Sequence, residues 1–153
     1  MHDVGLLLGF LALGISLGSA ITSRLAGFWA VGRLLFAANS LALTSATSFL
    51  LVAFLGKENV ASVAGLEFLY ALGAGMASPI ALTRAISVDT SITGSAAGLA
   101  GFIQMAVGAA CIWLVGTFAD PALSAGIIVT VTSAFAQVAF RLAMRSDFGR
   151  RTG

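Results

Sequence analysis

The chain has 153 residues, of which 59% are hydrophobic and 9% are charged, whereas an ordinary soluble domain carries about 25% charged residues. With a mean hydropathy of +1.03, this composition excludes a typical soluble domain and indicates a membrane protein. Only 2 residues are Pro, and the apolar runs are long and do not alternate, so we expect helices and not a β-barrel. The predicted fold class is an all-α membrane protein.

The charged and reactive residues exclude several function classes. Lys and Arg number 8 against 6 acidic residues, an excess too small to indicate a nucleic-acid partner. The single His is His2, and the single Cys, Cys111, lies deep in an apolar run. These residues supply neither a metal-binding set nor a nucleophile with a base, and no phosphate-binding loop is present. We therefore expect no enzyme activity, no cofactor and no metal site.

Five apolar segments are long enough to cross a hydrocarbon core of about 30 Å, which takes about 20 helical residues. The expected spans are residues 4–22, 34–56, 59–86, 93–117 and 121–142. They form a transmembrane bundle over residues 1–145, and residues 146–153 form a cytoplasmic tail.

The basic residues of the expected loops and tail are distributed unevenly between the two sides of the membrane. With five spans, seven arginines fall on one side and only Lys57 falls on the other. The positive-inside rule then predicts a cytoplasmic C-terminus and an external N-terminus. An odd number of spans with an uncharged external start is typical of a chain that begins partway through a larger protein.

Glycine is concentrated in the fourth expected span. Gly94 and Gly98 form a GxxxG pair, and Gly101 is followed after seven residues by Gly108. Helices associate in lipid by close packing, which glycine permits. Since the small residues occupy more than one face, we expect this helix to be central in the bundle. Gln104 then faces a neighbouring helix or a water-filled cavity. The alternative is that its amide forms a hydrogen bond with another helix and has no other role.

Small residues in two further spans indicate close packing in one and a weakened helical turn in the other. The first span repeats the GxxxG spacing in Gly5 with Gly9 and in Gly14 with Gly18, so it too should pack closely. The third span places together the following three residues: Gly73, Gly75 and Pro79. Proline removes one helical hydrogen bond, so this turn is either a hinge or a static kink that neighbouring helices relieve.

Glu67 is the only acidic residue well within a span. A carboxylate at this depth is costly and is a functional candidate by default, here for attracting a cationic drug or taking up a proton. The alternative is that Glu67 is wetted near the outer surface or bonds Tyr70, one turn further along the helix. Arg84, at the other end of this span, reaches the membrane surface or pairs with Asp89.

Polar side chains form a stripe on each of two other spans. In the second span the stripe consists of Ser40, Thr44, Thr47 and Ser48, with Asn39 at its edge. In the fifth span it consists of Thr130, Ser133, Gln137 and Arg141. Both stripes are expected to turn inward, toward neighbouring helices.

The run from Tyr70 to Gly116 has a family resemblance. Its segments GAGMASPIALTRAIS and GSAAGLAGFIQMAVGAA resemble the tenth and eleventh helices of major facilitator superfamily transporters, most closely the bicyclomycin and chloramphenicol type of drug efflux protein. The resemblance covers nearly the whole chain and is specific in the G-S-A-x-G/A-L-x-G-F-x-Q run. It implies that the five spans are the eighth to twelfth helices of a major-facilitator-like bundle of twelve.

The loop after the first span can be compared with the family's loop signature, a Gly followed by Asp-Arg and then Gly-Arg. The residues that correspond are Gly18, Arg24, Gly32 and Arg33. Ser23 stands where the signature has Asp, and the spacing is stretched, so this cytoplasmic loop is a degenerate form of the signature.

The resemblance implies a function and a site. The function is that of a partial secondary transporter, for multidrug or small-molecule efflux by proton-coupled alternating access, in the bacterial inner membrane. The cavity face comes from the first, third and fourth spans, and the second and fifth are outer scaffold. The candidate residues for substrate binding or coupling are Glu67, Gln104, Tyr70, Phe102 and Met105.

The resemblance also implies partners. Besides the lipid bilayer and a small-molecule substrate, the chain needs the missing N-terminal half of a transporter or further copies of itself, because alone it does not complete a transport cycle. The alternative is a small stand-alone membrane protein whose glycine-rich helices act in the assembly or regulation of a membrane complex.

Overall fold

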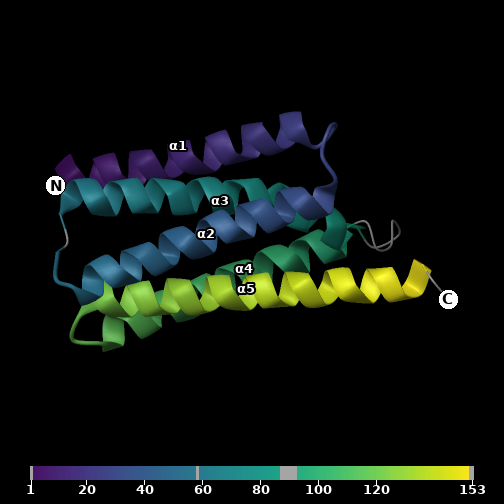
Figure 1. Cartoon of the computed structure of the whole chain (residues 1–153). Helices are drawn as coiled ribbons and strands as arrows, with labels where there is room; N and C mark the ends of the chain where they lie inside the picture. Colours follow the sequence, from purple (N-terminus) through teal and green to yellow (C-terminus); the bar gives the residue numbers. More distant parts are fainter. Residues whose placement is uncertain (1, 58, 87–92, 152–153) are drawn as a thin grey trace.

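The computed structural model describes residues 2–57, 59–86 and 93–151, which form five α-helices. These are α1 (His2–Leu25), α2 (Val31–Phe54), α3 (Val60–Ile86), α4 (Thr93–Thr117) and α5 (Pro121–Arg151). All five are long and apolar enough to cross a membrane, so the prediction of an all-α membrane protein is confirmed. The two ends of the chain lie at opposite ends of the bundle (Figure 1).

The helix bounds agree with the expected spans most closely in α3 and α4. In contrast, α2 begins at Val31, three residues before the expected start, and α5 continues to Arg151 through most of the expected tail. The part of α5 that is apolar enough to span a membrane ends at Met144.

Local hydrogen bonds define several helix ends. The side-chain oxygen of Asn59 accepts from the backbone N–H of Ser62 at the start of α3, and that of Asp120 accepts from two N–H groups at the start of α5, as N-cap residues do. At the end of α2, Gly56 has a φ of +59°, and the N–H of Lys57 donates to the carbonyl of Val52. This is a Schellman motif, which favours glycine at its left-handed position.

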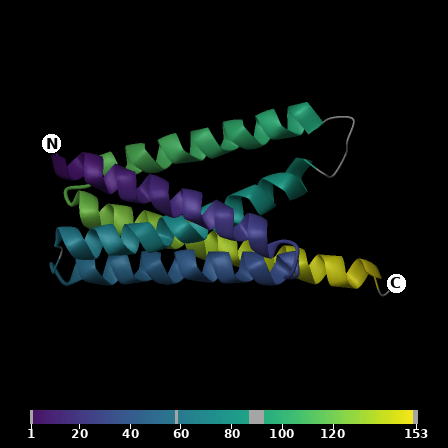
Figure 2. The ribbon, with the colours of Figure 1, turned by 90° about the horizontal axis from the view of Figure 1, so that it is seen from above.

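Helix α3 is the centre of the packed part of the chain, because it contacts α1 on one side and α2 on another, while α2 also contacts α5. The most buried cluster joins Leu34, Leu35 and Ala38 of α2 to Met76 and Ile80 of α3. Figure 2 shows α4 running along one side of the molecule. Its main contacts are with α3 and α5, the helices to which it is joined in sequence.

Glycines create the closest approach, between α1 and α3. A Cβ placed on Gly14 would lie 2.9 Å from the Cβ of Ala71, and one placed on Gly18 would lie 2.9 Å from the backbone nitrogen of Met76. From the other side, a Cβ on Gly75 would lie 2.7 Å from the Cα of Ile15. The two backbones therefore touch along a surface that only glycine permits. Gly5 and Gly9 of α1, in contrast, have nothing within 4 Å.

The Pro79 region of α3 is held by its neighbours. Gly73 packs against α2, where a Cβ would lie 2.8 Å from the carbonyl oxygen of Ala38, and Gly75 packs against α1. Pro79 lacks the N–H that would bond the Gly75 carbonyl, and the hydroxyl of Ser19 donates to that carbonyl instead, at 3.1 Å. Figure 2 shows α3 changing direction in its second half. These contacts favour the static kink over the hinge.

The expected central position of α4 is not what the structure has. None of the membrane-spanning window of α4 is buried within the chain. A Cβ placed on any of its five glycines would meet nothing within 4 Å, and these are Gly94, Gly98, Gly101, Gly108 and Gly116. The physical reason is that small residues permit a close approach without determining which helix approaches. The packing role of these glycines stays a prediction about helices outside this chain.

The stripe on α5 turns inward as expected, since Ser133 and Gln137 are buried. The amide of Gln137 donates to the hydroxyl of Ser40 on α2, at 3.1 Å. The stripe on α2 is divided, however. Thr44 and Thr47 are exposed, and each hydroxyl donates to a backbone carbonyl of its own helix, which satisfies it without a second helix.

Candidate functional site

A cavity of about 310 Å³ lies among four helices beside the one acidic side chain of the spans. From α3 it is lined by Glu67 and Tyr70, together with Val63 and Leu66. The remaining wall consists of Leu11 of α1, Ser45 and Phe49 of α2, and Ala125 and Val129 of α5. The two residues that the sequence singles out in the third span therefore line a common hollow.

Glu67 is placed there by the geometry of α3. It is half-buried, and Tyr70 follows three residues later on the same helical face. In the described part of the chain no hydrogen bond or ion pair reaches the Glu67 carboxylate, from Tyr70 or from any other side chain. The alternative in which Tyr70 bonds Glu67 is thus not what the structure has. The carboxylate is free to bind a ligand or a proton.

The lining of this cavity is otherwise apolar, except for a few hydroxyl groups. The aromatic rings of Phe49 and Tyr70 form part of the wall, and Ser45 is buried on α2. No Lys or Arg lines the cavity. A site with one acid, aromatic walls and no basic residue suits a small organic cation, because aromatic faces attract cations as carboxylates do.

The three candidates on α4 lie elsewhere. Phe102 and Met105 are 70% and 75% exposed, and Gln104 is also exposed. None of them lines the cavity with Glu67. The structure thus does not bring the α4 candidates together with Glu67, since this cavity is lined from α1, α2, α3 and α5. A cavity face formed by the first, third and fourth spans stays a prediction about the larger assembly.

Sequence reasoning missed the contribution of α2 and α5. Ser45 lies among the hydroxyl residues of the second span, but on another face from Thr44 and Thr47. The signal that could have found it is the spacing to Phe49, four residues later and hence on the same face. On α5 the hydroxyl of Thr130, which directly follows Val129 of the cavity wall, is buried without a hydrogen-bond partner.

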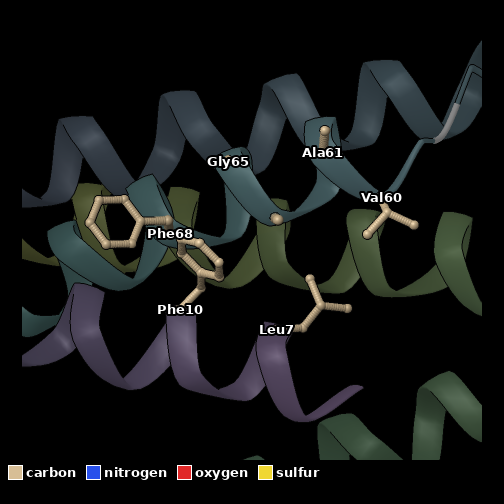
Figure 3. A pocket seen from close by; sticks show the side chains of 7 residues that line it. Leu7, Phe10, Val60, Ala61, Gly65 and Phe68 are labelled. Atoms are coloured by element: carbon tan, nitrogen blue, oxygen red, sulfur yellow. The ribbon is translucent and has the colours of Figure 1, made fainter. Parts of the chain in front are cut away.

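A second hollow, of about 590 Å³, lies between α1 and α3, and its side chains are all apolar and include Leu7, Phe10, Val60 and Phe68 (Figure 3). The rings of Phe10 and Phe68 meet edge to face, with centroids 6.4 Å apart. With no polar side chain to orient a ligand, this groove differs in chemistry from the cavity that contains Glu67.

The loop residues of the family signature lie apart from both hollows. Arg24 is in the last turn of α1, and Gly32 and Arg33 are in the first turn of α2. Gly18, the first residue of the signature, lies within α1 at its crossing with α3. The possible pairing of Arg84 with Asp89 lies outside the side chains that the structure describes.

No protein-family model matches the sequence, and no curated protein or solved structure matches it significantly. Among the described residues, no group of three or more His, Cys, Asp or Glu side chains could hold a metal ion. The five apolar helices indicate an integral membrane protein, and four of them enclose a cavity that contains a carboxylate.

Proposed function

We propose that this chain is part of a secondary transporter, in which Glu67 binds a cationic substrate or a proton within the helix bundle. The observation that carries the proposal is the position of Glu67, a half-buried carboxylate that lines a cavity among four apolar helices. Ionisable groups at membrane depth commonly mark substrate or proton pathways. The resemblance to major facilitator drug efflux proteins supports the same conclusion from the sequence.

The chemistry of the cavity suits proton-coupled exchange. A single carboxylate that binds either a proton or a cation, but not both, links release of one to uptake of the other. Phe49 and Tyr70 would hold the organic part of the substrate. The volume of about 310 Å³ is at the small end of ligand sites, so a drug-sized substrate needs further walls.

Helices outside this chain would complete the site on the side of α4, whose candidate residues do not line the cavity with Glu67. None of the membrane-spanning window of α4 is buried within the chain, Gln104, Phe102 and Met105 are exposed, and a Cβ on any glycine of this helix would meet nothing within 4 Å. A transporter half packed against α4 would cover these residues. Alternating access would then arise from rocking of the two bundles about the site between them.

The proposal includes the orientation of the chain in the membrane and the type of membrane. The uneven distribution of arginines supports a cytoplasmic C-terminus and an external N-terminus, and the resemblance supports a bacterial inner membrane. In that orientation α3 begins outside, and Glu67, seven residues after Val60, is about 10 Å along its helix from the outer end.

The proposal is tested by measuring cation transport by variants in which Glu67 is replaced. Inside-out vesicles from cells that carry the altered chain at its own locus would take up ethidium in response to an imposed proton gradient. We expect Glu67→Gln to lower the uptake rate at least tenfold at equal protein level, and Glu67→Asp to retain part of it. Thr47→Val, on the exposed face of α2, is the matched control. Full activity in Glu67→Gln would exclude a coupling role.

A second function is favoured by the exposed glycines of α4 alone. The chain would then be a stand-alone membrane protein that assembles or regulates a complex through this helix. In that case Glu67→Gln and Gln104→Ala have no effect, while Gly98→Leu separates the chain from its complex. The transporter proposal instead expects both polar substitutions to abolish export in the full assembly.

A further inference from the structure

We propose that the groove between the start of α2 and the end of the α5 span binds the phosphate of an anionic phospholipid, through Arg33 and Arg141. This groove has a volume of about 590 Å³. Its basic side chains are these two arginines, and its apolar walls include Phe36, Phe140 and Met144. The inference is independent of the proposed transport function.

The depth of the two arginines matches a lipid headgroup. Arg33 is the third residue of α2, so it lies at the edge of that span. Arg141 follows Pro121 by 20 residues, which places it about 30 Å along α5, the thickness of the hydrocarbon core. Both guanidinium groups thus lie at the membrane surface, at the end of the bundle where α2 begins.

Contacts within the chain hold the groove together but do not neutralise the positive charge of its two arginines. The guanidinium carbon of Arg141 lies 5.5 Å from the centre of the Phe36 ring, a cation–π contact that positions the charge at the groove. Gly32 contacts the end of the Met144 side chain, whose Cε would lie 2.7 Å from a Cβ at that position. Among the side chains that the structure describes, no carboxylate pairs with Arg33 or Arg141.

The combination of groups selects a lipid. Guanidinium groups bind phosphate oxygens in a bidentate manner, and basic pockets between membrane helices bind anionic headgroups. A free phosphate ion uses only the arginines. An acyl chain also covers the apolar walls from Phe36 and Phe140, which gives the lipid the advantage.

Native mass spectrometry of the detergent-solubilised full chain tests this proposal. Titration with phosphatidylglycerol and with phosphatidylcholine compares an anionic with a zwitterionic headgroup. We expect one phosphatidylglycerol per chain, bound at least about fivefold more tightly than phosphatidylcholine, since each arginine near the surface adds a factor of about five. Equal affinities in the unaltered chain overturn the proposal, whatever the variants do.

The variants locate the site. Arg33→Gln with Arg141→Gln should remove the preference, and Arg33→Lys with Arg141→Lys should keep most of it. Arg24→Gln, an arginine at the same end of the bundle but outside the groove, should leave it unchanged. Circular dichroism checks that each variant is folded. A preference that survives loss of both groove arginines, or that Arg24→Gln removes equally, contradicts the proposed site.

A competition experiment separates the two sources of phosphate. Inorganic phosphate in large excess should displace little phosphatidylglycerol, because it gains nothing from the apolar walls. If inorganic phosphate alone displaces the lipid completely, the groove is a site for free phosphate and the lipid assignment is wrong.

Discussion

The hydroxyl of Ser19 on α1 donates a hydrogen bond of 3.1 Å to the carbonyl of Gly75 on α3. That carbonyl has no helical donor, because the residue four positions later is Pro79. One turn further along α1, the hydroxyl of Thr22 donates to the neighbouring Met76 carbonyl at 2.9 Å. Two hydroxyls of α1 thus donate to carbonyls of the α3 turn that precedes Pro79.

This relationship predicts a coupling between Ser19 and Pro79. We expect Ser19→Ala to destabilise the protein by about 1 kcal/mol, the size of an interhelical hydrogen bond in a membrane protein. In a Pro79→Ala background the same substitution should cost much less, because the new N–H bonds the Gly75 carbonyl within α3. A double-mutant cycle of unfolding free energies in detergent measures this. Purely additive effects would contradict the compensation.

The glycine contact between α1 and α3 predicts opposite effects for two glycines of one helix. Gly18→Ala should destabilise by about 1–3 kcal/mol, because its Cβ meets backbone atoms that cannot move aside. Gly9→Ala has open space and should be neutral or stabilising by up to about 1 kcal/mol, since alanine favours the helix. Thermal unfolding of the two variants makes the comparison, and equal effects would rule out the close contact at Gly18.

The hydrogen bond between Ser40 and Gln137 predicts that removing one partner costs more stability than removing both. Ser40→Ala leaves the buried amide of Gln137 without its partner, and the other amide atom, Oε1, is already unpaired. We expect this single substitution to cost about 1–3 kcal/mol. Adding Gln137→Leu should recover most of the loss, because no polar group then remains unpaired. A double variant less stable than Ser40→Ala alone would contradict this account.

The glycines of α4 predict an effect on association and not on folding. Gly98 has no neighbour within 4 Å, so Gly98→Leu should leave the thermal stability of the purified chain unchanged. The same substitution should release the chain from its complex in native membranes, measured by co-purification. Gly18→Leu is the contrasting variant, which should unfold the chain itself. A loss of stability in Gly98→Leu would place α4 inside the bundle.

The sequence was sufficient for the helices and for the close packing of α1, but not for the identity of the helix it packs against. Apolar length predicts the helices, and the Gly14 and Gly18 spacing predicts a close contact that α3 provides. The same reasoning was wrong about α4, because small residues indicate that a helix is able to pack without identifying its neighbour. The cavity walls from Ser45 and Val129 depend on the pairing of α2 with α5, which no local pattern encodes.

The most direct measurement asks what covers α4 in the native membrane. A photo-crosslinking amino acid at Gly101, in the exposed face of α4, would capture its neighbour, and one at Phe135, a 75% exposed residue of α5, is the lipid-facing control. The transporter account predicts that the crosslink at position 101 joins α4 to membrane helices of a different sequence, a second transporter half, while position 135 captures lipid. Capture of lipid alone at position 101 would contradict it.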